Sequence, residues 1–138
     1  MARRHAPPLY EEITQGVRIR VRPKFMHDES EPSRGRFMWS YTVDVENESE
    51  QTWTILRRHW RIVDAQGRLQ AVDGDGVIGQ TPTLMPGERF SYTSGAPLAA
   101  PSGMMSGTYD LKDESGFEIV ATIPVFSLDS PYDTSLPS

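Results

Sequence analysis

Two short segments carry the residue types that ligand binding needs, one rich in arginine and one rich in glycine. Arg57, Arg58 and His59 are consecutive in the arginine-rich segment. A guanidinium group suits phosphate or carboxylate because it donates two parallel hydrogen bonds, and Trp60 beside it offers a ring for stacking. The alternative is structural, with Trp60 in the core and the arginines paired with acids on a solvated strand face.

The glycine-rich segment has the spacing of a dinucleotide-binding motif, formed by Gly74, Asp75, Gly76 and Gly79. That motif holds a pyrophosphate at the N-terminus of a helix. Pro82 and Pro86 follow so closely that we expect no helix to begin here. We predict a loop between strands, whose amides either form a small anion-binding nest or only make a tight turn.

No pattern typical of catalysis or metal binding is found in the sequence. Neither a Gly-x-Ser-x-Gly elbow nor a His-Glu-x-x-His helix occurs. The chain has no cysteine, so thiolate chemistry and disulfides are excluded, and its three histidines are scattered. We therefore expect no enzymatic activity, no catalytic residue, no metal site and no cofactor.

Short β-strands are the elements expected to position these segments. Residues 17–22 alternate Val or Ile with Arg, and residues 37–45 place five apolar side chains at every second position. In residues 52–63 the apolar positions change from odd to even numbers, which predicts a β-bulge between residues 55 and 58. Turn signals follow at Gln66-Gly67, Pro86-Gly87 and Glu114-Ser115-Gly116.

This pattern predicts an all-β fold, an antiparallel immunoglobulin- or fibronectin-III-like β-sandwich of seven or eight strands. We expect the sandwich to span residues 15–128, after a flexible extension over residues 1–14 and before a loose tail over residues 129–138. The row of Arg18, Arg20 and Arg22 is expected on the wet face of an outer strand. The other interpretation of this row is a groove for an acidic partner.

Charge and hydropathy limit the partners and the location. The net charge is −5, divided into +2 over residues 1–70 and −7 over residues 71–138, which argues against bulk nucleic-acid binding. No stretch approaches the roughly 18 apolar residues of a membrane span, and the N-terminal residues do not resemble a signal peptide. We expect a cytoplasmic protein without membrane insertion.

Several short runs, in the order and spacing found here, resemble the ApaG proteins of bacteria. They are Arg58-His59-Trp60, residues 74–82, Pro86-Gly87-Glu88, residues 92–95, Gly107-Thr108-Tyr109 and residues 123–126. The resemblance covers about residues 15–128. It implies a fibronectin-III-like sandwich, an association with cobalt and magnesium efflux, and a kinship with interaction domains of F-box and DNA-polymerase-interacting proteins. It carries over no catalytic residue.

Three functions remain as hypotheses. The first is a non-catalytic binding or regulatory domain for a protein partner, with a link to cobalt and magnesium homeostasis that only the resemblance implies. The second is a binder of a small phosphorylated anion, pyrophosphate or a nucleotide, held by the glycine-rich loop with Arg57, Arg58 or His59. The third, with the least support, is a nucleotide phosphohydrolase. The sequence leaves the oligomeric state open.

Overall fold

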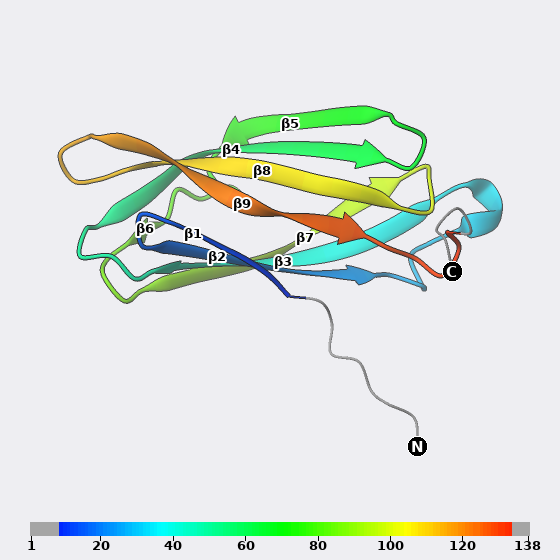
Figure 1. The fold of residues 1–138 in the computed structure, drawn as a ribbon, viewed down its shortest axis with the longest axis horizontal. Helices are drawn as coiled ribbons and strands as arrows, with labels where there is room; N and C mark the ends of the chain where they lie inside the picture. The colour runs from blue at the N-terminus through cyan, green and yellow to red at the C-terminus, as the bar shows by residue number, and fades with distance from the viewer. Residues whose placement is uncertain (1–8, 134–138) are drawn as a thin grey trace, which may run out of the picture.

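Two antiparallel sheets face each other in the computed structural model, which describes residues 9–133 (Figure 1). The first sheet has the order β1-β2-β3-β7, with strands Tyr10–Thr14, Val17–Phe25, Phe37–Asn47 and Arg89–Leu98. The second has the order β5-β4-β8-β9, with strands Leu69–Asp75, Trp53–Asp64, Gly103–Lys112 and Glu118–Leu128. The short β6 (Thr83–Leu84) pairs with β4. The predicted all-β sandwich is confirmed.

Alternation of apolar and polar residues builds the core from both sheets. On β2 and β3 the odd-numbered side chains face inward, so Val17, Ile19 and Val21 are fully buried, as are Val43 and Val45. The second sheet adds large side chains from β4, β8 and β9, among them Trp60, Met105, Tyr109, Leu111, Ile123 and Phe126. The only helical segment in the described chain is a 3₁₀ turn, η1 (Pro32–Arg34).

A β-bulge interrupts β4 where the sequence predicted it. The pairing of β4 with β8 shifts between Ile55 and Arg57, so that Leu56 is the extra residue. Trp53 and Ile55 are buried before the bulge, and Trp60 and Ile62 are buried after it. One inserted residue thus keeps both halves of a long strand facing the core.

The N-terminal boundary differs from the expectation. Residues 10–14 form β1, which pairs with β2 from Tyr10↔Val21 to Thr14↔Val17, so a flexible extension over residues 1–14 is wrong for this part. Residues 1–8 lie outside the described residues. Because β1 covers the free edge of β2, the arginine row lies on an inner strand of the sheet and not on an outer one. The tight turn at Gln15 and Gly16, both with positive φ, makes this hairpin.

The first residues of the expected tail also belong to the sandwich. The indole Nε1 of Trp39 donates a hydrogen bond to the carbonyl oxygen of Asp129 over 2.7 Å. The ring of Tyr132 lies about 6 Å from those of Phe25 and Phe37. A loose tail is therefore wrong for residues 129–132, while residues 134–138 lie outside the described part of the chain.

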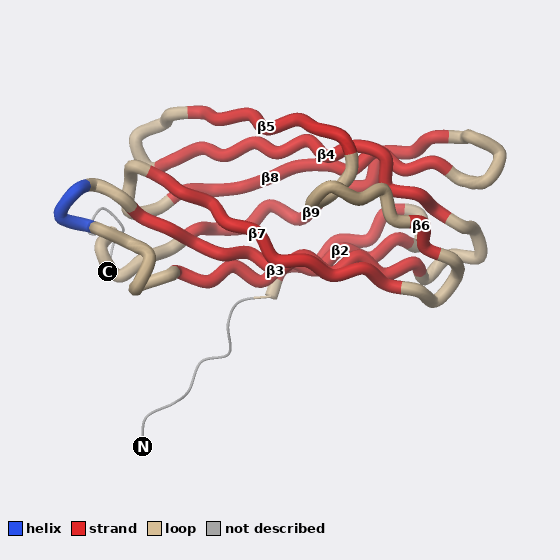
Figure 2. The backbone as a smooth tube through the Cα atoms, turned by 180° about the vertical axis from the view of Figure 1, so that it is seen from behind, coloured by secondary structure: helices blue, strands red, loops and turns tan. Residues whose placement is uncertain are grey.

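The two long margins of the sandwich differ. On one margin β1 packs against β9, the side of the molecule that Figure 1 shows in front. The amide of Thr122 donates to Thr14 Oγ1 over 3.1 Å, and the Tyr10 ring lies 6.0 Å from that of Phe126. On the other margin the edge strands are β5 and β7, each with a neighbour on one side only (Figure 2). This open margin positions the candidate site.

Candidate functional site

The side chains of Arg57 and Arg58 lie on opposite faces of the second sheet, and the bulge in β4 determines that Arg58 is the one facing inward. Arg57 lies on the outer face, where its Nε donates to Asp110 Oδ2 over 2.8 Å and its Nη2 to Glu118 Oε1 over 2.6 Å. Arg58 has the same inward phase as Trp60 and lines a cavity between the two sheets. Only one of the two predicted arginines is therefore at the open margin.

Arg58 is held in place by the glycine-rich segment. Its Nη1 donates to the carbonyl oxygens of Asp75 and Gly76 over 2.8 and 3.1 Å. Arg58 is the register partner of Gly74, and a Cβ on Gly74 would lie 2.8–3.0 Å from the guanidinium atoms. Glycine at position 74 thus lets the guanidinium lie flat against the backbone of β5.

Beyond β5 the chain makes a two-residue turn of the I′ kind. Val77 and Gln80 exchange both backbone hydrogen bonds, and the residues between them, Ile78 and Gly79, have φ values of 42° and 77°. A positive φ is unusual for a β-branched residue and costs conformational energy. Ile78 is nevertheless 51% exposed and lies at the rim of the cavity.

Backbone amides in this loop are largely engaged with the protein itself. The amide of Gly76 donates to the carbonyl oxygen of Leu56. The amide of Val77 donates to the carbonyl oxygen of Gln80, and the amide of Gln80 donates to that of Val77. No helix follows, so the prediction that this is not a Rossmann loop is confirmed. The amides of Gly76, Val77 and Gln80 are therefore occupied, and an anion nest in this loop would have to be built from other amides.

The cavity has a volume of about 400 Å³, in the range of small-ligand sites. Its floor comes from both sheets and consists of Tyr41, Trp60, Ile62, Tyr92 and Met105. Its sides include Val72 of β5 and Ser94 of β7, the two open edges. Among the lining residues, all of which the structure describes, Arg58 alone carries a charge.

Tyr92 of the cavity floor contacts a second tyrosine, Tyr109, which is fully buried in the core. The hydroxyl groups of Tyr92 and Tyr109 are hydrogen-bonded to each other. Burial away from water raises the pKa of both phenols well above the ordinary value of 10.0, because the phenolate would lose its hydration. Both hydroxyls therefore stay protonated, and neither offers a base for proton-transfer chemistry.

His59 lies on the outer face with Arg57, away from the cavity. Its Nδ1 lies 2.7 Å from Asp73 Oδ1 and its Nε2 lies 2.8 Å from Asp110 Oδ2. Hydrogen bonds to Asp110 and Asp73 raise the pKa of His59, and the same contact with His59 keeps the pKa of Asp73 low. Arg61 adds an ion pair to Asp73 at 3.2 Å. Each ring nitrogen is engaged, so the imidazole is a bridge between strands.

The structure thus divides the predicted site residues into two groups. Arg58, Gly74, Asp75 and Gly76 come together through the pairing of β4 with β5, as the hypothesis of a shared site required. Arg57 and His59 pair with acids on the other face, as the structural alternative required. Gly79 lies at the tip of the turn, with no atom near the place where its Cβ would be.

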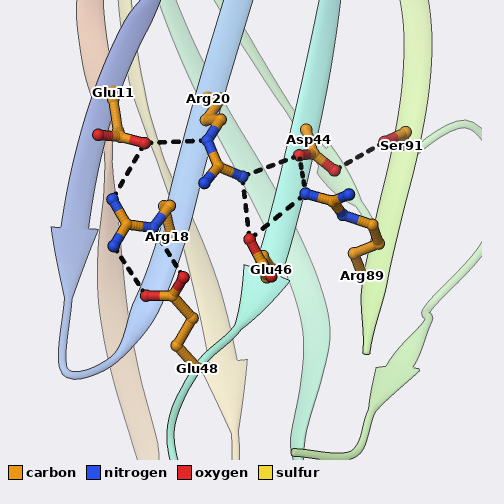
Figure 3. A network of polar contacts seen from close by, with 8 residues as sticks. All are labelled: Glu11, Arg18, Arg20, Asp44, Glu46, Glu48, Arg89 and Ser91. Atoms are coloured by element: carbon orange, nitrogen blue, oxygen red, sulfur yellow. Dashed lines mark hydrogen bonds and ion pairs between the residues drawn. The ribbon is translucent and has the colours of Figure 1, made fainter. Parts of the chain in front are cut away.

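Arg18 and Arg20 of the arginine row on β2 are part of a structural network on the outer face of the first sheet, whereas Arg22 is exposed and takes no part in it (Figure 3). Arg18 pairs with Glu11 of β1 and with Glu48, and Arg20 bridges Glu11 to Asp44 and Glu46 of β3. The network continues to Arg89 and Ser91 of β7, the edge strand. Its carboxylates neutralise Arg18 and Arg20, which favours the solvated-face interpretation over a groove for an acidic partner.

Sequence reasoning missed the walls that β3 and β7 supply, above all Tyr41, Tyr92 and Ser94. These residues line the same cavity as Arg58 but belong to the other sheet. The periodicity of a single strand carries no information on which residues of two sheets face each other. Residues 9–133 contain no group of three His, Asp or Glu arranged to hold a metal ion. The same part of the chain has no helix long and apolar enough to cross a membrane.

Fold and site together define a fibronectin-III-like β-sandwich domain with one open margin and a ligand-sized cavity beneath it. The model of the ApaG domain family matches residues 27–113, and the chain belongs to this family. Protein ApaG of Rhodospirillum centenum is 48% identical over 130 residues, 94% of this chain and all of that protein. Protein ApaG of Maricaulis maris is 51% identical over 125 residues, 91% of this chain and 96% of the relative.

A solved structure shows the same fold. The crystal structure of the putative ApaA protein from Bordetella pertussis superposes with a TM-score of 0.81 at 36% identity, covering 94% of this chain and all of that one. A second X-ray structure, 37% identical, has a TM-score of 0.79 and covers 89% of this chain and 93% of the other. The architecture described above is therefore that of solved relatives.

Proposed function

We propose that the protein is a non-catalytic binding module that takes an extended segment of a partner protein along its open margin. The observation that carries the proposal is the edge strand β7 beside the cavity. Residues 90–98 of β7 hold no charged side chain, and β3 pairs with one side of the strand only. Natural edges are usually protected by charges, prolines, bulges or covering segments, and in this stretch Pro97 near the end of the strand is the one such residue. An uncharged edge of this length suits pairing with another strand.

Strand addition explains the rest of the open margin. An added strand gains affinity from main-chain hydrogen bonds and specificity from pockets that accept alternate side chains. The cavity lies next to Ser94, Ala96 and Pro97 of β7, so a side chain from a strand on this edge can enter it. This arrangement needs no reacting group from the protein.

The binding role can be combined with the expected location and with the expected link to metal homeostasis. In this proposal the module acts in the cytoplasm, and the link to cobalt and magnesium homeostasis implied by the family resemblance runs through the partner protein. The phosphorylated-anion alternative is favoured by Arg58 lying against the glycine-rich loop. It is disfavoured by the engagement of the amides of Gly76, Val77 and Gln80 within the protein.

A selection of random peptides with the pure protein tests the proposal. We expect enriched peptides to slow amide hydrogen exchange along β7. Gly95→Lys should abolish their binding, because a charge on the edge opposes strand pairing. The substitution is spatially tolerated: a Cβ at Gly95 meets the Met38 Sδ at 3.6 Å and nothing closer.

Thr42→Lys is the matched control. Thr42 is the register partner of Thr93 and lies on the same outer face, but on β3, which has neighbours on both sides. It should leave peptide binding unchanged. Protection of β1 or β5 in place of β7, or full binding by the Gly95→Lys variant, would contradict the proposal.

A further inference from the structure

Among the arginines of the described strands, Arg22 and Arg58 have no carboxylate partner, and only Arg58 is partly withdrawn from water, since Arg22 is exposed. Arg18, Arg20, Arg57, Arg61 and Arg89 all form ion pairs with Asp or Glu. Arg58 donates only to two backbone carbonyls, through Nη1. Within residues 9–133 its Nε and Nη2 have no hydrogen-bond partner. The cavity therefore contains a cation whose counter-ion the protein does not supply.

The guanidinium is also fixed in direction. The carbonyls of Asp75 and Gly76 hold Nη1 on one side, and the backbone of Gly74 lies flat against the group. Nε and Nη2 form the side of a guanidinium that donates two parallel hydrogen bonds to the oxygens of a carboxylate. A pre-oriented fork loses less conformational entropy on binding than a free arginine does.

The charge of the site selects one class of anion. The nearest other cations along β4, Arg57 and His59, face the opposite side of the sheet and are paired with acids. A doubly charged phosphate in the cavity would bury a second negative charge with no cation to pair it, at a high desolvation cost. A carboxylate brings a single charge, which Arg58 balances.

The walls specify what must be attached to that carboxylate. Tyr41 and Trp60 form the floor, with ring centroids 5.3 Å apart in an edge-to-face arrangement, and Met105 lies beside them. Aromatic and thioether surfaces of this kind favour aromatic or large aliphatic groups. The volume of about 400 Å³ accommodates one such group.

We infer that the Arg58 cavity binds a carboxylate carried next to an aromatic or large aliphatic group, as at the C-terminal residue of a polypeptide. The inference deepens the proposed function. The carboxylate site itself is argued independently of that function, and only the claim that the carboxylate belongs to a polypeptide rests on it. A strand added to β7 would end at Arg58, with its last side chain on the aromatic floor. The same chemistry occurs in a free aromatic acid, so the experiment separates the two sources.

Calorimetric titration with matched probes tests the inference. The first pair is N-acetyl-phenylalanine and its amide, which have nearly the same shape, but the amide lacks the negative charge and one of the two acceptor oxygens. Losing a charge-assisted bidentate contact should weaken binding of the amide by roughly 10- to 100-fold. Inorganic pyrophosphate should bind more weakly than the acid. Equal binding of acid and amide, or tighter binding of pyrophosphate, would overturn the inference.

Substitutions locate the contact. Arg58→Lys keeps the charge but loses the fork, and Arg58→Gln loses both, so binding of the acid should fall in that order. Arg57→Gln, one residue away on the other face, should bind as the wild type does. Because Arg58 also anchors the loop, Ser94→Phe provides a second route: it fills the cavity with Arg58 intact and should abolish binding. Unchanged affinity in both Arg58→Lys and Ser94→Phe would rule the site out.

An octapeptide ending in phenylalanine distinguishes the sources. Binding at least tenfold tighter than that of N-acetyl-phenylalanine would assign the site to a polypeptide end, and equal binding would assign it to a small acid. Gly95→Lys should weaken the octapeptide but not the small acid. If the small acid binds and Gly95→Lys leaves the octapeptide unaffected, the strand-addition proposal fails while the carboxylate site stands.

Discussion

Arg57 and Arg58 are consecutive strand residues whose guanidinium groups lie on opposite faces of one sheet, and the bulge at Leu56 decides that Arg58 is the one that faces inward. Outside, Arg57 ties β4 to β8 and β9 through Asp110 and Glu118. Inside, Arg58 fixes the loop after β5 and points into the cavity. A single sequence motif therefore serves two roles, and substitutions at the two positions should have different consequences.

Gly76→Ala should destabilise the fold much more than Gly79→Ala. Both glycines have positive φ, but a Cβ at Gly76 would lie 2.1 Å from the carbonyl oxygen of Gln80, whereas one at Gly79 meets nothing within 4 Å. We expect a loss of about 1–2 kcal/mol for Gly79→Ala from the left-handed backbone alone, and a larger loss for Gly76→Ala. Urea unfolding monitored by tryptophan fluorescence measures both, and equal losses would contradict the turn geometry.

Ile78→Asn should stabilise the protein. Ile78 has a φ of 42° in a two-residue turn, and its side chain is half exposed, so little apolar burial is lost. Asn-Gly is the preferred pair for a turn of this kind, since asparagine tolerates positive φ. We expect a gain of about 1 kcal/mol and a higher midpoint of thermal unfolding. Ile78→Val, which stays β-branched, is the control and should bring no gain.

The pH dependence of stability should reveal the His59 bridge. The pKa of His59 is raised in the folded state from 6.5, chiefly by Asp110 and then by Asp73. Its stabilising contribution is therefore complete below about pH 6.5 and is lost as the pH rises through the raised value. The pKa of Asp73 is lowered from 3.8, so the contribution of that carboxylate is lost as the pH falls through its folded-state pKa. The bridge is strongest between these limits.

Proton NMR titration of the imidazole measures this effect. Asp110→Asn should return the pKa of His59 toward its ordinary value further than Asp73→Asn does, because the contact with Asp110 has the larger influence. In urea unfolding, the wild type should have a higher free energy of unfolding at mildly acidic pH than at alkaline pH. The Asp110→Asn variant should lose most of this difference. A His59 that titrates at or below pH 6.5 in the wild type would refute the bridge.

Asn47→Ala should cost about 2–4 kcal/mol, because it leaves several buried polar groups without partners. The side chain is fully buried, and its Nδ2 donates to the carbonyls of Gln51 and Leu84 over 2.6 and 2.9 Å. Its Oδ1 accepts from the amide of Ser49 over 3.0 Å. Thr42→Ala, half-buried on the same strand and with a single hydrogen bond between its hydroxyl and that of Thr93, should cost far less in the same chemical unfolding experiment.

Apolar alternation sufficed to predict most of the fold. The strands around Ile19 and Val43, and the bulge before Arg58, follow from which positions must face the core. The strand β1 has a weak alternation, and its place depends on Glu11 meeting Arg18 and Arg20 on the next strand. A contact between side chains of neighbouring strands produces no apolar alternation in the sequence. For this reason the sequence alone places residues 10–14 in a flexible extension.

The candidate site was predictable in part. The turn at Gln66-Gly67 sets the register of the β4–β5 hairpin, and that register brings Arg58 opposite Gly74. What the sequence could not reveal is how Tyr92 and Ser94 of the other sheet lie relative to Arg58. Packing between sheets depends on twist and side-chain volume over the whole domain, and these quantities have no local signature.

The margin where β1 meets β9 has a practical consequence for how the protein can be divided. The family match spans residues 27–113, and a fragment cut at those positions would lack β1, β2 and β9. It would lay bare the side chains that Ile19, Ile123 and Phe126 now cover. The smallest piece able to fold by itself is thus longer than the segment by which the family is recognised, and expression trials should begin at or before Tyr10 and extend past Tyr132.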